Sequence, residues 1–218
     1  MVTLHGFSLS NYYNMVKHML LFKGCDFEEN KLYPQDPNLL AICPTGKVPA
    51  MTTSCGAHLF ETSVILEYIE ERYPTPSLYP NELVERSRVR ELNKVLELYL
   101  DVPARRLLPF ALRGGEPDSE TVQKTYETCL NGCLVINNLC SMSPYAMGSS
   151  LSVADIFMRY ALVVPQMVKV FWKHGNPLEK IDGLHQWELL LSDSDISKKI
   201  DQDFAAARPE FMARVRAS

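Results

Sequence analysis

Apolar residues follow two different rhythms in this sequence, with short alternating runs first and helical spacing later. Residues 2–5 read as a short strand that leads into a polar loop. Residues 12–23 carry apolar side chains three and four positions apart, which predicts a helix that Gly24 ends. Residues 27–32 alternate loosely and predict a second strand. A strand, a helix and a strand in this order favour a parallel pair joined by a right-handed crossover.

A second group of short elements follows an irregular connection whose three prolines leave room for one short helix. Residues 48–52 and 57–60 are predicted strands, with a short glycine-containing turn between them. Residues 62–73 have the apolar spacing of an amphipathic helix, which is expected to end before Pro74. The predicted order of elements up to this proline is β-α-β-α-β-β-α.

The pattern changes near residue 76, because no convincing strand follows it. Helical spacing appears over four further stretches and a helical tail, the stretches being 82–112, 119–140, 152–171 and 177–191. The predicted organisation is therefore an α/β domain over 1–76, a linker over 77–85 and an all-α domain over 86–218.

Composition narrows the function classes. The 218-residue chain has a formal net charge of −4 and no basic stripe, which argues against nucleic-acid binding. The N-terminus lacks a secretory signal, and no apolar run approaches the roughly 20 residues that span a bilayer. The six cysteines form no CxxC pair, so we expect reduced thiols in a cytoplasmic protein. Cys129, Cys133 and Cys140 share one helical stripe and are interpreted as small buried hydrophobes; no metal site is predicted.

Four local motifs occur at separate places along the chain. They are Pro-Thr-Gly-Lys-Val-Pro at 44–49, Glu-Thr-Ser-Val-Ile at 61–65, Ser-Val-Ala-Asp at 152–155, and the loop over 8–16 with Ser10 six residues before Val16. Together they resemble the glutathione S-transferase family over nearly the whole chain. The resemblance implies a thioredoxin-like N-terminal domain that holds glutathione, followed by an all-helical C-terminal domain.

The resemblance also implies where glutathione binds. In the family the last proline of the first motif is cis, and the backbone before it pairs with the cysteinyl unit of glutathione, which assigns Lys47, Val48 and Pro49 to the site. The γ-glutamyl carboxylate is expected at the helix N-terminus beside Thr62, with its ammonium group near Glu61. Thr62 replaces the usual serine and keeps its hydroxyl. An ordinary turn before a strand, and an ordinary helix cap at Thr62, remain the alternatives.

The Ser152 motif is explained by physical chemistry alone. Ser152 and Asp155 have the spacing of a capping box, and Leu151 with Ile156 can form the hydrophobic staple of the same helix. This motif predicts a helix start and contributes to folding, so it carries no chemistry.

The loop over 8–16 resembles the catalytic loop of serine-type members, such as the theta, zeta or beta classes. Tyrosine-type members carry a tyrosine in the first strand and cysteine-type members a cysteine in the loop, and this sequence has neither. Ser10 is the predicted activating residue, with Ser8, Asn11, Tyr12 and Tyr13 as rivals and a simple N-cap as the alternative. A hydroxyl hydrogen bond and the helix N-terminus would favour the glutathione thiolate, which then attacks a small hydrophobic electrophile.

The electrophile is expected between the two domains, and its predicted contacts are Tyr12, Arg106 and Phe110, with Tyr99 and Pro103 on the same expected helix face. A core or dimer role for these residues remains open, since family members are usually homodimers and Phe60 is a possible interface anchor. Two other functions compete with conjugation. One is a non-catalytic family member that binds a protein partner, and the other, disfavoured by the missing loop cysteine, is a thiol–disulfide oxidoreductase.

Overall fold

The computed structural model describes residues 1–217, and the chain forms two compact units within them. The first unit comprises Met1–Leu78 together with Ser194–Pro209, and the second comprises Tyr79–Asp193 and the residues from Glu210 onward. The C-terminal segment Ser194–Pro209 thus groups with the N-terminal part of the chain. The domain limits inferred from sequence stay a prediction.

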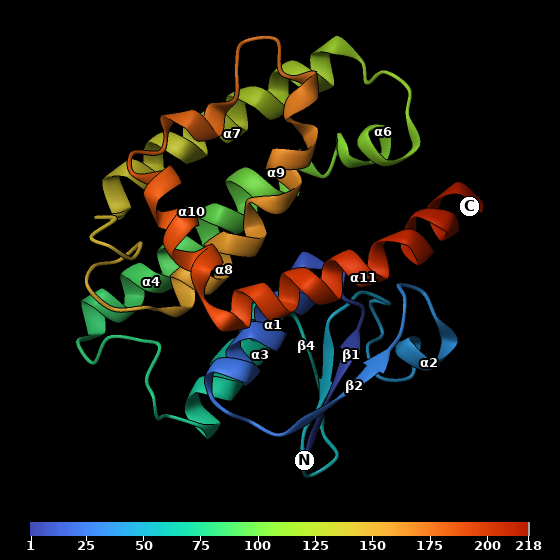
Figure 1. Ribbon diagram of the computed structural model, residues 1–218, viewed down its shortest axis with the longest axis vertical. Coiled ribbons are helices and arrows are strands. Elements are labelled where there is room, and N and C mark those ends of the chain that lie inside the picture. Colours follow the sequence, from blue (N-terminus) through green and yellow to red (C-terminus); the bar gives the residue numbers. More distant parts are fainter. Residues whose placement is uncertain (218) are drawn as a thin grey trace. The chain divides into compact units, whose positions relative to one another are not determined.

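The first unit contains one four-stranded sheet (Figure 1). Its strands are β1 (Val2–Gly6), β2 (Phe27–Lys31), β3 (Ala50–Thr52) and β4 (His58–Phe60). They lie in the order β2-β1-β3-β4, with β1 parallel to β2 and the other two pairs antiparallel. The predicted parallel pair at the start of the chain is confirmed.

Three helices complete the N-terminal part of this unit: α1 (Asn11–Phe22), α2 (Pro37–Leu40) and α3 (Thr62–Arg72). Helices α1 and α3 pack side by side (Figure 1). Leu39 of α2 joins the small apolar cluster around Ala50 of β3. The observed order β-α-β-α-β-β-α and the thioredoxin-like class agree with the sequence prediction.

Local sequence explains the limits of α1. Ser10 has the extended backbone of an N-cap, with φ −78° and ψ 115°. Lys23 is the C-cap, and Gly24 follows it with φ +62°, a conformation in which glycine carries no Cβ penalty. The helix therefore begins one residue before the predicted start and ends where the glycine predicts.

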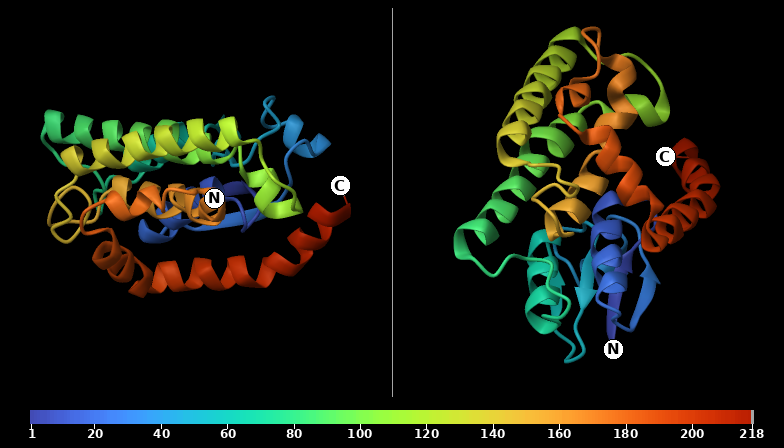
Figure 2. Two further views of the ribbon diagram at one scale, coloured as in Figure 1. Left: turned by 90° about the horizontal axis from the view of Figure 1, so that it is seen from above. Right: turned by 60° about the vertical axis from the view of Figure 1, so that its left-hand side comes forward.

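The second unit is helical. Its elements are α4 (Leu83–Val95), the π-helical η1 (Leu96–Asp101), α5 (Val102–Ala104), α6 (Leu108–Arg113), α7 (Ser119–Leu139), α8 (Val153–Ala161), α9 (Val163–Val168), η2 (Lys169–Phe171), η3 (Pro177–Lys180) and α10 (Leu184–Asp193). Helix α11 (Asp195–Ala217) ends the described chain. Helix α4, continued by η1, lies alongside α7 (Figures 1 and 2). Within the described part of this unit the β pairing is a single bridge between Tyr145 and Gly148.

The expectation of one continuous helix over 82–112 is wrong. The segment winds as a π-helix over Leu96–Asp101 and breaks again after Ala104. Pro103 and Pro109 lack the N–H that an α-helix needs at those positions, which accounts for interruptions near them. Gly132 of α7 sits against this stretch, because a Cβ there would lie 2.8 Å from the Tyr99 Cβ atom.

Two expectations for the second unit are confirmed. The Ser152–Asp155 capping box is present at the start of α8. Of the three cysteines expected to be buried, Cys129 and Cys133 are fully buried on α7, and burial raises the pKa of each thiol to about 12. Cys140, the C-cap of α7, is half-buried, so the expectation is wrong for that residue. All six cysteines are free thiols. Among residues 1–217, no helix combines the length and the hydropathy required to cross a bilayer.

Candidate functional site

Ser10 occupies the turn between β1 and α1 and is half-buried. Its N–H donates to the Phe7 carbonyl at 3.0 Å, and its Oγ accepts from the Tyr13 N–H at 3.3 Å. Among the described residues nothing accepts its hydroxyl proton. The hydroxyl is therefore able to donate to a ligand, at a helix terminus that carries partial positive charge.

The other candidate residues of the loop differ in whether their polar groups are already engaged within the protein. The Tyr13 hydroxyl donates to Glu29 Oε2, and burial together with this acidic partner raises the pKa of the phenol far above its ordinary value. Tyr13 is thus engaged elsewhere. Asn11 is buried and Tyr12 half-buried, and each has a polar or ring contact of its own. Ser8 takes part through its main-chain carbonyl, which accepts from Asn14.

The segment before β3 has the backbone that the resemblance implies, since the Val48–Pro49 peptide bond is cis. Pro49 is buried, Val48 is half-buried and Lys47 is exposed. Within residues 1–217 the N–H and C=O of Val48 have no hydrogen-bond partner. Both main-chain groups are therefore able to pair with an extended peptide-like ligand.

The start of α3 is unusual in its backbone. Glu61 has φ +69° and ψ 116°, a region that non-glycine residues rarely adopt, and its side chain does not cap the helix. Strained backbone of this kind clusters at functional sites. Thr62 is buried, and no described group bonds its hydroxyl. The uncapped N–H groups of the first turn and this hydroxyl make a site suited to a carboxylate.

Sheet register brings these three segments to one edge. One row of paired residues crosses three strands, namely His5, Ala50 and Phe60. The chain leaves β1 just after this row toward Ser10, enters β3 just before it from Val48, and leaves β4 just after it at Glu61. The Ser10 hydroxyl, the Val48 segment and the N-terminus of α3 accordingly lie at the same end of the sheet in the first unit.

The predicted electrophile contacts are divided between the units. Tyr12 lies in α1 of the first unit. Arg106 and Phe110 lie in the second, where Arg106 is exposed between α5 and α6 and Phe110 is half-buried in α6. The predicted spacing requires a single helix here, whereas the chain forms η1, α5 and α6 with a turn before α6. A common pocket for these residues stays a prediction.

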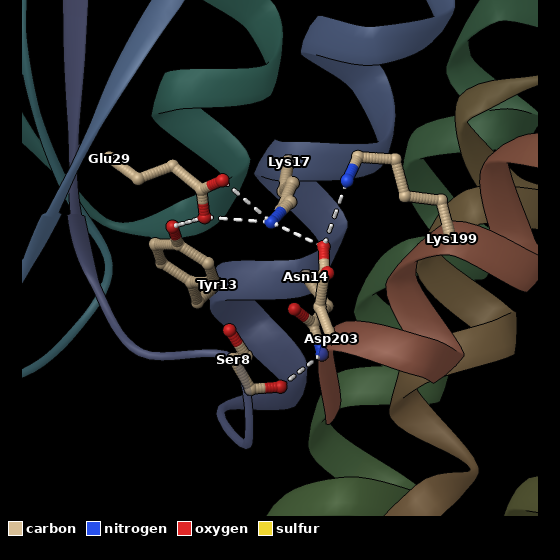
Figure 3. Close-up of polar contacts among 7 residues, drawn as sticks. All are labelled: Ser8, Tyr13, Asn14, Lys17, Glu29, Lys199 and Asp203. Atoms are coloured by element: carbon tan, nitrogen blue, oxygen red, sulfur yellow. Dashed lines mark hydrogen bonds and ion pairs between the residues drawn. The ribbon is translucent and has the colours of Figure 1, made fainter. Parts of the chain in front are cut away.

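The sequence does not predict the polar network that surrounds Lys17 (Figure 3). Lys17 is nearly fully buried and bonds Glu29 at 2.7 and 2.8 Å and Asp203 at 2.9 Å. Asn14 Nδ2 donates to the Ser8 carbonyl at 2.8 Å. The sequence feature that could have indicated this network is spacing. Ser10, Asn14 and Lys17 recur at helical intervals, so these polar residues share one face of the helix.

Comparison with known proteins gives a consistent picture. The model of the glutathione S-transferase N-terminal domain matches residues 4–77. A glutathione S-transferase of Pseudomonas putida is 35% identical over 223 aligned positions, covering 99% of this chain and 98% of the relative. A maleylacetoacetate isomerase of Pseudomonas aeruginosa is 26% identical over 168 positions, covering 73% of this chain and 76% of the relative.

The fold has close counterparts among solved structures. A glutathione transferase of Phanerochaete chrysosporium, solved with oxidized glutathione, has a TM-score of 0.79 at 15% identity, covering 95% of this chain and 96% of that one. At this identity the likeness shows the fold, whereas the full-length Pseudomonas putida relative shows descent. The chain belongs to the glutathione S-transferase family.

Proposed function

We propose that this protein is a glutathione transferase that activates the thiol of glutathione with Ser10 and transfers it to a small hydrophobic electrophile. The observation that carries the proposal is the row His5–Ala50–Phe60, which gathers the Ser10 turn, Val48 and the start of α3 at one sheet edge. The family membership and the names of the relatives support the same activity.

Glutathione would be held by main-chain and side-chain groups of the first unit. The Val48 N–H and C=O would pair with the cysteinyl unit beside cis-Pro49. The γ-glutamyl carboxylate would bind at the α3 N-terminus and the Thr62 hydroxyl, with the ammonium group near Glu61. Lys47 adds an exposed positive charge to the same loop.

The chemistry is stabilisation of an anion. A free thiol has a pKa of about 8.5 and is mostly protonated at neutral pH. A hydrogen bond from Ser10 and the partial positive charge of the α1 N-terminus favour the thiolate, and each unit of lowered pKa corresponds to about 1.4 kcal/mol. The thiol proton passes to solvent, and the sulfur forms a bond to the electrophilic carbon. In a substitution a leaving group departs with the bonding electrons, and in an addition the other carbon of the double bond takes up a proton from solvent.

The remaining parts of the proposal rest on family resemblance. The electrophile would contact Tyr12, Arg106 and Phe110. The protein would act in the cytoplasm in detoxification, as a homodimer with Phe60 as one interface anchor. A partner-binding protein without activity is the competing function, and failure of the folded protein to bind glutathione resin would favour it.

The test compares Ser10→Ala with Ser8→Ala, since Ser8 contributes its main-chain carbonyl, which alanine retains. With glutathione and a chlorodinitrobenzene as substrates, Ser10→Ala should raise the pKa of the bound thiol by about one unit or more and slow conjugation about tenfold at neutral pH. Ser8→Ala should match the wild type. Unchanged activity in Ser10→Ala would assign the activation to another residue.

A further inference from the structure

One face of α1 is polar although it is buried. Tyr13, Asn14 and Lys17 are 2%, 3% and 2% exposed, and they follow Ser10 at intervals of three, four and seven residues. Figure 3 shows the three side chains with their polar partners. On an amphipathic helix this face normally carries apolar side chains. Buried polar groups destabilise a fold unless hydrogen bonds satisfy them, so the partners of each side chain indicate what it does.

The partner of Asn14 is the turn that carries Ser10. Its amide faces the Ser8 carbonyl oxygen at 2.8 Å, and because a carbonyl only accepts, the facing group is the NH₂. Within residues 1–217 the Ser8 carbonyl has no second donor. The Asn14 contact is therefore the bond that fixes the peptide plane between Ser8 and Leu9, two residues before Ser10.

The carbonyl oxygen of the Asn14 side chain indicates a role other than stabilising the fold. Asn14 Oδ1 is buried and has no hydrogen-bond partner in the described chain. A buried acceptor without a donor destabilises the folded state, and an apolar side chain of the same shape would avoid that penalty. Asparagine is thus a poor residue for packing at this position but a suitable one for holding a carbonyl.

Contacts of Tyr13 hold the same turn. Tyr13 donates its N–H to Ser10 Oγ, and its ring lies so close to Gly6 that a Cβ there would be 2.5 Å from Tyr13 Cδ2. The Tyr13 hydroxyl is in turn fixed on Glu29, which Lys17 binds. Tyr13 and Asn14 therefore each hold the Ser10 turn through a hydrogen bond.

We propose that Asn14 is a positioning residue for Ser10. By holding the Ser8 carbonyl, its amide keeps the Ser10 hydroxyl aimed at the sulfur of bound glutathione. The inference rests on the proposed thiol activation by Ser10. A hydrogen bond to a thiolate weakens steeply with misalignment, so a looser turn raises the thiol pKa while leaving the glutathione contacts at Val48 and Thr62 intact.

The experiment uses Asn14→Leu, which removes the donor and the unpaired acceptor and nearly keeps the side-chain shape. Asn138→Leu is the matched control, because Asn138 also donates its amide to a main-chain carbonyl, that of Leu134, but in α7 of the second unit. For each variant the ultraviolet titration of bound glutathione gives the thiol pKa, steady-state kinetics give kcat and KM, and thermal unfolding gives stability. Asn14→Ala repeats the test with a smaller side chain in case leucine does not fit.

We expect Asn14→Leu and Asn14→Ala to raise the bound-thiol pKa by about half to one unit, so that kcat at pH 6.5 falls about three- to tenfold. The loss should disappear at pH values above the raised pKa, and KM for glutathione should stay within about twofold, since a purely structural defect would lower the rate at every pH. Asn138→Leu should keep the wild-type pH profile.

Two results would overturn the proposal, and they differ in whether the proposed function survives. If Ser10→Ala raises the thiol pKa and folded Asn14 variants do not, the positioning role is wrong and the proposed function stands. If Ser10→Ala leaves the thiol pKa unchanged, or the wild type does not bind glutathione, the role of Ser10 falls and that of Asn14 falls with it.

Discussion

At the scale of single residues, Thr62 gives a direct test of glutathione binding. Its hydroxyl is unpaired among the described residues, and it lies at the uncapped start of α3. We expect Thr62→Val to weaken glutathione binding by about 1–3 kcal/mol, because the ligand carboxylate would lose a donor in a buried place. Isothermal titration calorimetry measures the change.

Thr62→Ser is the natural control, since serine keeps the hydroxyl and removes only a methyl group. It should bind glutathione about as tightly as the wild type. Equal affinity in Thr62→Val and the wild type would remove Thr62 from the site and leave its hydroxyl without a role in binding.

At the scale of elements, Asp155 joins three segments of the second unit. Its fully buried carboxylate accepts from the Ala146 N–H at 2.7 Å, from Trp187 Nε1 at 2.8 Å, and from the N–H and Oγ of Ser152 at 2.9 Å each. The capping box at the start of α8 is therefore also the anchor for α10 and for the loop before α8. We therefore expect Asp155 to contribute more to stability than a helix cap alone.

We expect Asp155→Asn to destabilise the protein by about 2–4 kcal/mol, because the amide offers one acceptor oxygen and leaves buried donors unpaired at about 1–3 kcal/mol each. Urea unfolding followed by circular dichroism measures the loss. Asp118→Asn, at the exposed N-cap of α7, should change stability by less than about 0.5 kcal/mol, since asparagine also caps well. Similar losses in the two variants would reduce Asp155 to an ordinary cap.

Elements were predictable from sequence where their causes are local. The strands, the glycine that ends α1 and the capping box at Ser152 depend on neighbours within a few positions, and the sequence predicts them. The sequence does not predict the π-helical turn at Leu96–Asp101, which packs against α7 at Gly132, a residue distant in sequence. The burial of Lys17 was missed for a related reason, since its partner Asp203 lies 186 residues away in the chain.

At the scale of the whole molecule, that pair is one of the contacts that join the segment Ser194–Pro209 to the N-terminal unit. Lys17 of α1 meets Asp203 of α11 at 2.9 Å and Glu29 of β2 at 2.7 Å. One buried ammonium group thus joins elements from both ends of the sequence (Figure 3). Taking charges out of water is costly, and a paired, hydrogen-bonded arrangement offsets that cost.

The same pair makes stability depend on pH. Partial burial opposes ionisation of Asp203, but the hydrogen bond and charge of Lys17, aided by Lys199, outweigh it, so the pKa of Asp203 lies below its ordinary value. The unfolded-state pKa of an aspartate is about 3.9, and at pH values above it the lowered folded-state pKa of Asp203 stabilises the protein. This contribution is lost as the pH falls through the folded-state pKa.

We therefore expect Asp203→Asn to lower the urea midpoint of the first unit at pH 7, and the difference from the wild type to shrink as the pH falls below about 4. Asp26→Asn is the control, because Asp26 is exposed and has no ion pair in the described chain, and it should leave the midpoint unchanged at every pH. Urea unfolding across pH 2–7 measures both. A difference between Asp203→Asn and the wild type that persists unchanged at the lowest pH would show that Asp203 acts through packing and not through its charge.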